Sequence, residues 1–247
     1  MRTVLATAGL LLFLASADAS AGARHIRIET HHHGPIHVWV PDGYDPAHAG
    51  VVVYVHGYFA DVDDAWKQYR LAHQFAKSRI DAVFIAPEAP TSPTDDISWS
   101  SLSDLLARVE DGTDIELPDG PLVAVGHSGA HRTLTEWLDD DDLDTIVLLD
   151  ALYGKVDELK SWVDASEDHR LIDVSVITRP WAEQLHAQLP ETVVFDGFPP
   201  RHSGRMRDAR EARVIHVRSH LGHMPLVTGG RALPQTLRAL RMPLVKR

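Results

Sequence analysis

Short apolar runs alternate with segments of helical periodicity along most of this 247-residue chain. The runs at residues 24–29 and 36–40 alternate polar and apolar side chains, which is typical of strands with one exposed face. Later runs are continuously apolar, as expected of strands that are covered on both faces of a sheet. These buried runs lie at residues 51–55, 81–86, 121–125, 145–149, 171–178 and 213–217.

Most of the intervening segments have the apolar spacing of amphipathic helices. They lie at residues 62–78, 102–109, 132–138, 181–189 and 231–240. Strands that alternate with helices in this way predict an α/β fold, with a mostly parallel central sheet and helices on both faces. Residues 198–210 are rich in Pro, Gly, Arg and His, and this composition predicts an exposed loop.

The beginning of the chain predicts a leader rather than a part of the fold. Residues 1–3 form a short, positively charged start. The apolar run at residues 4–15 that follows is too short for a good transmembrane helix. The small residues at positions 17 and 19 offer a cleavage site. We therefore expect residues 1–19 to be a signal peptide and residues 20–247 to form a single domain. The mature protein is then expected to be secreted or periplasmic, without stable membrane insertion.

Composition narrows the range of partners and cofactors. Asp and Glu outnumber Lys and Arg by 35 to 24, and the formal net charge of -11 argues against nucleic acid as the main partner. The chain has no Cys, so packing rather than disulfides must stabilise it. Three consecutive histidines at residues 31–33 cannot all face one ion in regular structure, and no motif with metal-ligand or nucleotide-binding spacing is present. We expect neither a metal nor a cofactor, and the pattern leaves the oligomeric state open.

The apolar run at residues 121–125 leads into Gly-His-Ser-Gly-Ala at residues 126–130, and a helix is predicted directly after it. A strand, a tight turn with a serine at its apex and a helix together form a nucleophile elbow. The Ser128 hydroxyl then stands clear of the sheet at a helix N-terminus, where free N–H groups favour negative charge. Ala130 stands where the usual motif has a further glycine. A structural Gly-Ser turn is the alternative interpretation.

A second motif, His56-Gly57-Tyr58, directly follows the buried run at residues 51–55. Together with the elbow it resembles the α/β-hydrolase family, and the resemblance covers nearly the whole mature chain in element order. It implies that the N–H groups of Tyr58 and Gly129 form an oxyanion hole. We expect His56 to bridge neighbouring loops rather than to act as the base.

A serine nucleophile needs a histidine to accept its proton and a carboxylate to orient that histidine. Asp150 directly follows the buried run at residues 145–149, and the resemblance implies an acid at this position in some members of the family. In many other members the acid follows the next strand, which here ends at residues 177–180 without a carboxylate. Asp196 and Glu183 remain alternative acids.

The order Ser, acid, His in this family places the base after Asp150. The histidines that follow are His169, His186, His202, His216, His220 and His223. His216 lies inside an apolar run, which is typical of a core or edge histidine. His220 and His223 lie between the last run and the final helix, and the Gly-His pair at residues 222–223 fits the resemblance. We expect His223 to be the base, with His220 as the alternative.

Together, Ser128, Asp150 and His223 predict a serine hydrolase that cleaves an ester bond through an acyl-enzyme. The residues also allow an amidase or peptidase acting on cell-envelope or extracellular material. Acyl transfer to an acceptor other than water is a further interpretation. So is a catalytically inactive binding protein with this fold.

Two segments bear on the substrate. Residues 38–44 resemble secreted esterases that act on polymers. A short helix over residues 155–164 is expected to form at most a small cap and to bring Trp162 near the site. We therefore expect a small-molecule or polymer-attached acyl substrate.

Overall fold

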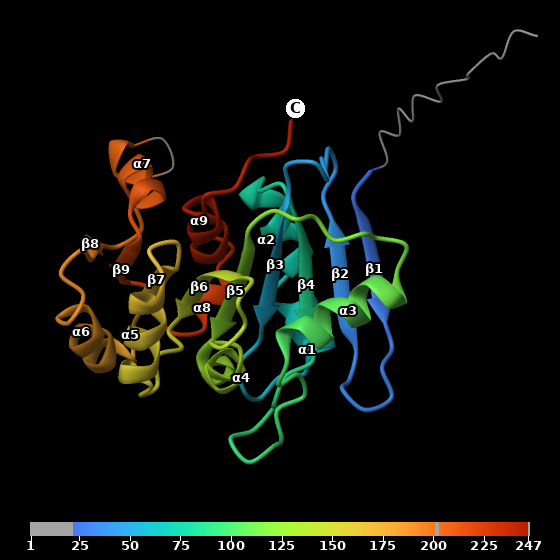
Figure 1. Ribbon diagram of the computed structural model, residues 1–247, viewed down its shortest axis with the longest axis horizontal. Helices are drawn as coiled ribbons and strands as arrows, with labels where there is room; N and C mark the ends of the chain where they lie inside the picture. Colours follow the sequence, from blue (N-terminus) through green and yellow to red (C-terminus); the bar gives the residue numbers. More distant parts are fainter. Residues whose placement is uncertain (1–21, 201–202, 247) are drawn as a thin grey trace, which may run out of the picture.

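The computed structural model describes residues 22–200 and 203–246, and these form a single nine-stranded sheet with helices on both sides (Figure 1). The strands are β1 (Arg24–Ile28), β2 (Ile36–Val40), β3 (Gly50–Val55), β4 (Ala82–Pro87), β5 (Leu122–His127), β6 (Leu143–Leu149), β7 (Arg170–Ser175), β8 (Val193–Asp196) and β9 (Val214–Arg218). Their order across the sheet is β1-β2-β4-β3-β5-β6-β7-β9-β8. Only the pairs β1–β2 and β2–β4 are antiparallel, which confirms the predicted mostly parallel sheet.

The helices divide between the two faces of the sheet. They are α1 (Val62–Gln68), α2 (Leu71–Ser78), α3 (Leu102–Gly112), α4 (His131–Glu136), α5 (Val156–Ala165), α6 (Arg179–His186), α7 (Gly204–Glu211), α8 (Pro225–Thr228) and α9 (Ala232–Arg238). Apolar residues of α3, α4, α5 and α6 share one core cluster, whereas α1, α2, α7, α8 and α9 contribute to the other. Alternate residues of β3 enter the two clusters, because successive side chains of a strand point to opposite faces.

Three local expectations were wrong. The predicted helix over residues 62–78 is two helices, separated at Arg70, whose φ of 55° is left-handed and cannot continue an α-helix. The strand at residues 36–40 is almost fully buried because it lies between β1 and β4, so the expected exposed face is missing there. The expected loop at residues 198–210 contains most of α7.

The expected cap helix also lies elsewhere. Helix α5 is the crossover between β6 and β7, and it packs beside α6 on the face of the sheet (Figure 1). Trp162 is only 4% exposed, belongs to the core beneath α5 and stacks on His169 with ring centroids 4.2 Å apart. The apolar side of this helix therefore packs into the fold rather than over the carboxyl ends of the strands.

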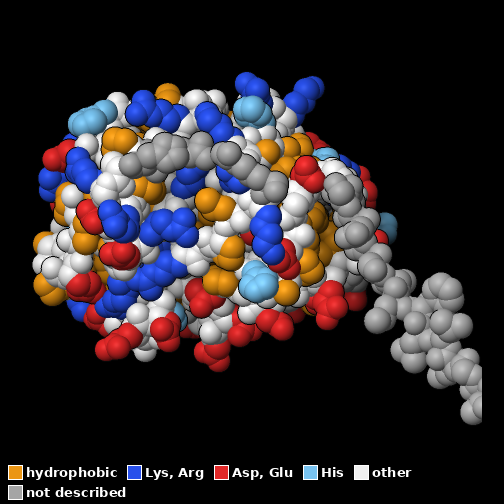
Figure 2. Space-filling model, turned by 90° about the horizontal axis from the view of Figure 1, so that it is seen from above, with side chains coloured by type: hydrophobic (Ala, Val, Ile, Leu, Met, Phe, Trp, Pro, Cys, Tyr) orange, Lys and Arg blue, Asp and Glu red, His pale blue; other side chains and the backbone are white. Residues whose placement is uncertain are grey.

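Charge is unevenly distributed over the molecule. Figure 2 shows many Lys and Arg side chains on the face seen from above, with Asp and Glu side chains gathered along one edge of it. None of the described helices is long and apolar enough to cross a membrane. The proposed signal peptide, residues 1–19, lies outside the described residues.

Candidate active site

The serine motif forms a sharp turn between a strand and a helix. Strand β5 ends at His127, and a single 3₁₀ turn over Ser128–Ala130 leads into α4. Ser128 has a φ of 53°, in the left-handed region that a side chain adopts only at a cost. Close packing fixes its neighbours: a Cβ at Gly126 would lie 2.4 Å from Leu134. Ala130 is 1% exposed, so its methyl group is accommodated where the motif usually has glycine.

The structure brings Ser128, Asp150 and His223 together from three strand ends. The Nε2 atom of His223 lies 2.9 Å from the hydroxyl oxygen of Ser128. The Nδ1 atom of the same ring lies 2.6 Å from Oδ2 of Asp150. This orientation lets Nδ1–H donate to the carboxylate and lets Nε2 accept the serine proton.

The carboxylate of Asp150 is completely buried and fully hydrogen-bonded. Its Oδ1 accepts from the N–H of Val176, at 2.8 Å, and from both the N–H and the hydroxyl of Thr178, at 2.9 and 2.7 Å. Its Oδ2 accepts from the N–H of Ile177 at 3.1 Å. Burial raises the pKa of Asp150, but the hydrogen bonds from His223, Thr178 and Val176 outweigh it and hold that pKa well below its usual range. Asp150 is therefore ionised at neutral pH.

The alternative acids do not reach this site. Asp196 is exposed at the edge of the sheet and pairs with Arg218 at 3.6 Å. Glu183 is exposed on α6. Neither carboxylate has a recorded contact with His223, whose ring bonds Asp150 and Ser128 instead.

The other histidines have separate places. His220 is exposed and lies near Gly197, while His169 stacks on Trp162. His186 and His216 stack on each other in the interior. His202 lies outside the described residues. As expected, His56 connects loops: its buried ring lies 3.0 Å from Glu88 and accepts from the N–H of Ala89.

The segment expected to supply the oxyanion hole packs directly on the elbow. A Cβ at Gly129 would lie 2.6 Å from the ring of Tyr58, and one at Gly57 would lie 2.8 Å from Cβ of Ser128. Glycines at these two positions let the loop after β3 approach the serine. Gly129 lies in the first turn of a helix, where N–H groups have no partner within the helix. Tyr58 and Gly129 are thus neighbours beside Ser128.

Two further side chains surround the triad residues and were not singled out from the sequence. His127 is buried and its ring packs on that of His223, with centroids 4.6 Å apart. Burial, with a smaller contribution from the charge of His223, lowers the pKa of His127 to about 3, so this ring is neutral. Burial and the charge of Asp150 raise the pKa of Tyr153, against the effect of its hydrogen bond to Ser128. His127 occupies the variable position of the motif, which could have drawn attention to it.

A sizeable cleft lies away from this site. It measures about 850 Å³ and is lined largely by acidic and polar side chains between α4 and α5. Its lining includes none of Ser128, Asp150 and His223. The triad geometry, rather than this cleft, therefore identifies the candidate site.

Solved structures of other proteins have the same arrangement of the chain, whereas no protein-family model and no curated protein sequence matched. FphF, a fluorophosphonate-binding serine hydrolase of Staphylococcus aureus, is 11% identical with a TM-score of 0.56, covering 87% of this chain and 96% of that one. A feruloyl esterase module from Clostridium thermocellum, as a serine-to-alanine mutant with sinapinate, is 13% identical with a TM-score of 0.55, covering 91% of each chain. A hyperthermophilic esterase from Pyrobaculum calidifontis is 12% identical with a TM-score of 0.53, covering 90% of this chain and 86% of that one. These likenesses concern the fold.

Proposed function

We propose that this chain, which has the α/β-hydrolase fold, is a secreted serine hydrolase that cleaves ester bonds through an acyl-enzyme. The observation that carries the proposal is the continuous contact from Asp150 through His223 to Ser128, at 2.6 and 2.9 Å. A buried carboxylate, an oriented imidazole and a serine hydroxyl in this order supply what an otherwise weak nucleophile needs.

In the first half of the reaction, Oγ of Ser128 attacks the acyl carbon while its proton passes to Nε2 of His223. The charge of Asp150 stabilises the imidazolium that forms. The N–H groups of Tyr58 and Gly129 donate to the oxyanion, where such donors typically contribute about 3 kcal/mol each. The imidazolium then returns its proton to the leaving alcohol, and the acyl group stays on Ser128.

In the second half, His223 takes a proton from water as the water oxygen attacks the acyl carbon. The tetrahedral intermediate collapses, the carboxylic acid leaves and Oγ recovers its proton from His223. These residues supply every proton transfer, so the proposed reaction requires no cofactor.

The proposal of export rests on the leader-like pattern of residues 1–19. We infer that cleavage after this segment releases a single domain beginning near residue 20. An exported enzyme meets its substrate outside the cytoplasm, which agrees with a polymer-attached or other extracellular ester. The chain has no cysteine and therefore forms no disulfide there.

The distribution of exposed apolar side chains supports an ester with an apolar part. Phe59 is 92% exposed and follows Tyr58, and Met224 is 43% exposed and follows His223. Ile177, which donates to Asp150, is 57% exposed. Trp181 is 37% exposed and its ring lies 5.7 Å from that of Tyr153. We call Phe59, Ile177, Trp181 and Met224 the apolar rim.

Exposed apolar side chains can mark binding surfaces, and these four adjoin residues of the candidate site in sequence or by contact. A site with an apolar rim accepts an acyl group while the rest of a large substrate remains outside. The esterases among the solved structures with this fold agree with an ester as the substrate.

Hydrolysis of p-nitrophenyl esters from acetate to octanoate by residues 20–247 tests the proposal directly. The Ser128→Ala variant should lose turnover, and a fluorophosphonate probe should label the wild type but not this variant. Ser100→Ala, at an exposed serine outside the site, is the matched control. Methyl esters, the corresponding amides and added alcohols as acceptors distinguish hydrolysis of esters from amidase activity and acyl transfer.

A folded wild type that neither turns over esters nor reacts with the probe would contradict the proposal and leave a binding role. Labelling of Ser128 without ester turnover, together with cleavage of the amides, would retain the nucleophile and change the substrate class to an amide.

A further inference from the structure

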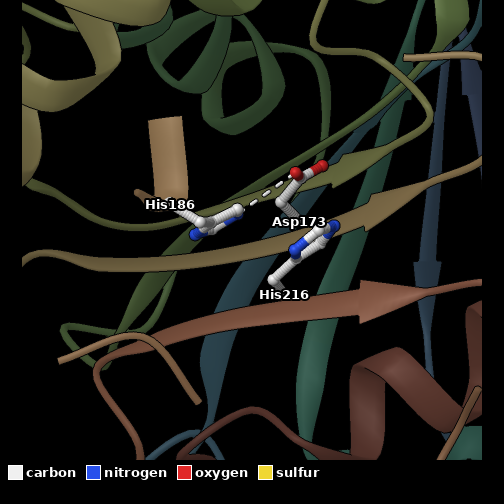
Figure 3. A group of neighbouring side chains, drawn as sticks. All are labelled: Asp173, His186 and His216. Atoms are coloured by element: carbon white, nitrogen blue, oxygen red, sulfur yellow. Dashed lines mark hydrogen bonds and ion pairs between the residues drawn. The ribbon is translucent and has the colours of Figure 1, made fainter. Parts of the chain in front are cut away.

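A second cluster of ionisable side chains lies in the interior, apart from Ser128. Asp173 of β7, His216 of β9 and His186 at the end of α6 are 0%, 1% and 8% exposed (Figure 3). One potential ligand atom from each lies within 4.8 Å of those of the other two. Within the described ranges, no other group of three His, Asp or Glu side chains meets this criterion.

The hydrogen bonds of His186 determine which of its nitrogens carries hydrogen. The hydroxyl of Thr192 donates its only proton to the carbonyl of Leu189, at 2.7 Å. The same hydroxyl oxygen lies 3.1 Å from Nδ1 of His186 and therefore acts there as an acceptor. His186 then carries a hydrogen on Nδ1, and in the singly protonated form of the ring the lone pair is on Nε2.

This assignment leaves two electron-rich atoms facing each other. Nε2 of His186 lies 3.2 Å from Oδ2 of Asp173 (Figure 3). A lone pair and a carboxylate oxygen repel each other at this distance unless a positive charge lies between them. Only a proton or a metal ion fits this position. A cation between the two atoms would remove this repulsion.

A second observation also points to a missing ligand. The other carboxylate oxygen, Oδ1 of Asp173, is buried and has no hydrogen-bond partner. A buried carboxylate oxygen without a partner is costly, and a bound cation removes that cost.

We propose that Asp173, His186 and His216 bind a divalent transition-metal ion, with Zn²⁺ the best fit. Two imidazoles and one carboxylate are typical of zinc and its transition-metal neighbours, whereas calcium and magnesium prefer all-oxygen sites. Ligands about 2.0 to 2.2 Å from a tetrahedral ion lie about 3.3 to 3.6 Å apart, slightly more than the 3.2 Å between Nε2 of His186 and Oδ2 of Asp173. Thr192 then orients His186 from outside, as metal-bound histidines require.

Binding requires one ring to turn. The rings of His186 and His216 are stacked, with centroids 4.5 Å apart and planes 11° apart. A metal ion must lie in the plane of each imidazole that binds it, so parallel rings cannot share an ion without a rotation. Nε2 of His216 lies 2.8 Å from the hydroxyl of Ser175, which a rotation of this ring exchanges for the metal.

Metal titration of the tag-free chain, residues 20–247, tests this inference after chelator treatment. We expect one Zn²⁺ or Co²⁺ per chain after desalting, a visible spectrum of four-coordinate Co²⁺ and an increased Tm in Zn²⁺. His186→Gln and His216→Gln should each weaken binding about 100-fold or more. Thr192→Val, which removes the acceptor for Nδ1–H and the hydroxyl's own bond to Leu189 but none of the three ligands, should weaken it about 10-fold to 100-fold.

Replacing His31, His32 and His33 together with Gln is the matched control, because these exposed histidines are the other plausible metal ligands. This control should retain the ion and its spectrum. Loss of binding in the control, retention in both cluster variants, or no stoichiometric metal on the folded wild type would each overturn the proposal. The wild-type measurement does not depend on how the variants fold. None of these readouts depends on esterase activity.

Discussion

Two Asp–His pairs with a fully buried carboxylate lie in the described part of the molecule, and they differ in how completely that carboxylate is satisfied. Asp150 bonds His223 at 2.6 Å and accepts four other hydrogen bonds, whereas Asp173 lies 3.2 Å from His186 and has an oxygen without a partner. A second, neutral histidine stacks on the histidine of each pair. His127 stacks on His223, and His216 stacks on His186. These last two ring pairs have similar centroid distances, 4.6 and 4.5 Å.

The difference indicates two uses of the same pair of residue types. A carboxylate held from every side is rigid and orients a base toward a serine at the surface. A carboxylate with a free oxygen, facing a nitrogen lone pair, is suited to holding a cation. Burial of an Asp–His pair therefore does not by itself indicate catalysis. What indicates it is the group that the histidine contacts besides the aspartate, which for His223 is the hydroxyl of Ser128.

The largest expected effect separates the two carboxylates by activity. Asp150→Asn should lower kcat about 10⁴-fold, because an amide at this position favours the wrong tautomer of His223. Asp173→Asn should leave kcat/KM on p-nitrophenyl esters within about threefold, because it contacts neither His223 nor Ser128. Steady-state kinetics on both variants, with circular dichroism as a check on folding, measure this.

Asp196→Asn is the matched control for the acid and should retain activity. Equal losses in Asp150→Asn and Asp173→Asn would mean that the two pairs act as one unit. A loss in Asp196→Asn alone would move the acid to the sheet edge.

The sequence located the first pair but not the second, for a physical reason. Ser128 and Asp150 directly follow strands and His223 lies in the loop after β9, and the carboxyl ends of parallel strands meet at one edge of the sheet. Asp173 and His216 lie within strands, and they become neighbours only through the register of β7 on β9. Between these strands the chain forms α6, β8 and α7, so no ligand spacing survives in the sequence.

The same reasoning applies to the fold. The continuous apolar runs marked the central strands well, because strands covered on both faces have no polar side to interrupt them. The break at Arg70 and the position of Trp162 depend on packing against distant elements. Periodicity within one segment does not encode such contacts.

The next effect concerns the stacked neutral ring in the first pair. The pKa of His127 is about 3 in the fold and about 6.5 in an unfolded chain, so between these values only the unfolded state binds the proton. Stability therefore decreases as the pH falls through this window. Between pH 7 and pH 5 the loss from this residue is about 2 kcal/mol.

Urea unfolding of the wild type and of His127→Phe at pH 7 and pH 5 measures this contribution. The aromatic replacement keeps a ring against His223 but does not titrate, so the wild type should lose about 2 kcal/mol more than the variant on acidification. Equal losses in the two proteins would show that His127 is not held neutral. Staying at or above pH 5 keeps protonation of carboxylates such as Asp150 out of the comparison.

A smaller effect tests whether full hydrogen bonding of Asp150 matters. Thr178→Val removes the 2.7 Å hydrogen bond from its hydroxyl but leaves the backbone donors. We expect a roughly 10-fold decrease in kcat, since the loss of a hydrogen bond to a charged group typically costs about 1.5 kcal/mol. Steady-state kinetics on p-nitrophenyl esters over a range of pH measure kcat and its pH profile.

Thr135→Val, which removes a hydroxyl bonded to the carbonyl of His131 on α4, is the control and should keep both kcat and the pH profile. An unchanged kcat in Thr178→Val would mean that the backbone N–H groups alone position the acid.

The smallest expected effect concerns substrate binding at the candidate active site, as opposed to the interior cluster around Asp173. Trp181→Ala and Phe59→Ala remove apolar surface beside Ser128, so each should raise KM for octanoate about 3-fold to 10-fold, with little change in kcat or for acetate. Val194→Ala and Leu244→Ala remove exposed apolar side chains that lie outside the apolar rim, and they should leave KM unchanged. Equal changes in all four variants would mean that exposed apolar area, rather than its position around Ser128, determines binding. Neither Trp181→Ala nor Phe59→Ala should alter metal binding at Asp173, because neither side chain belongs to the proposed metal site.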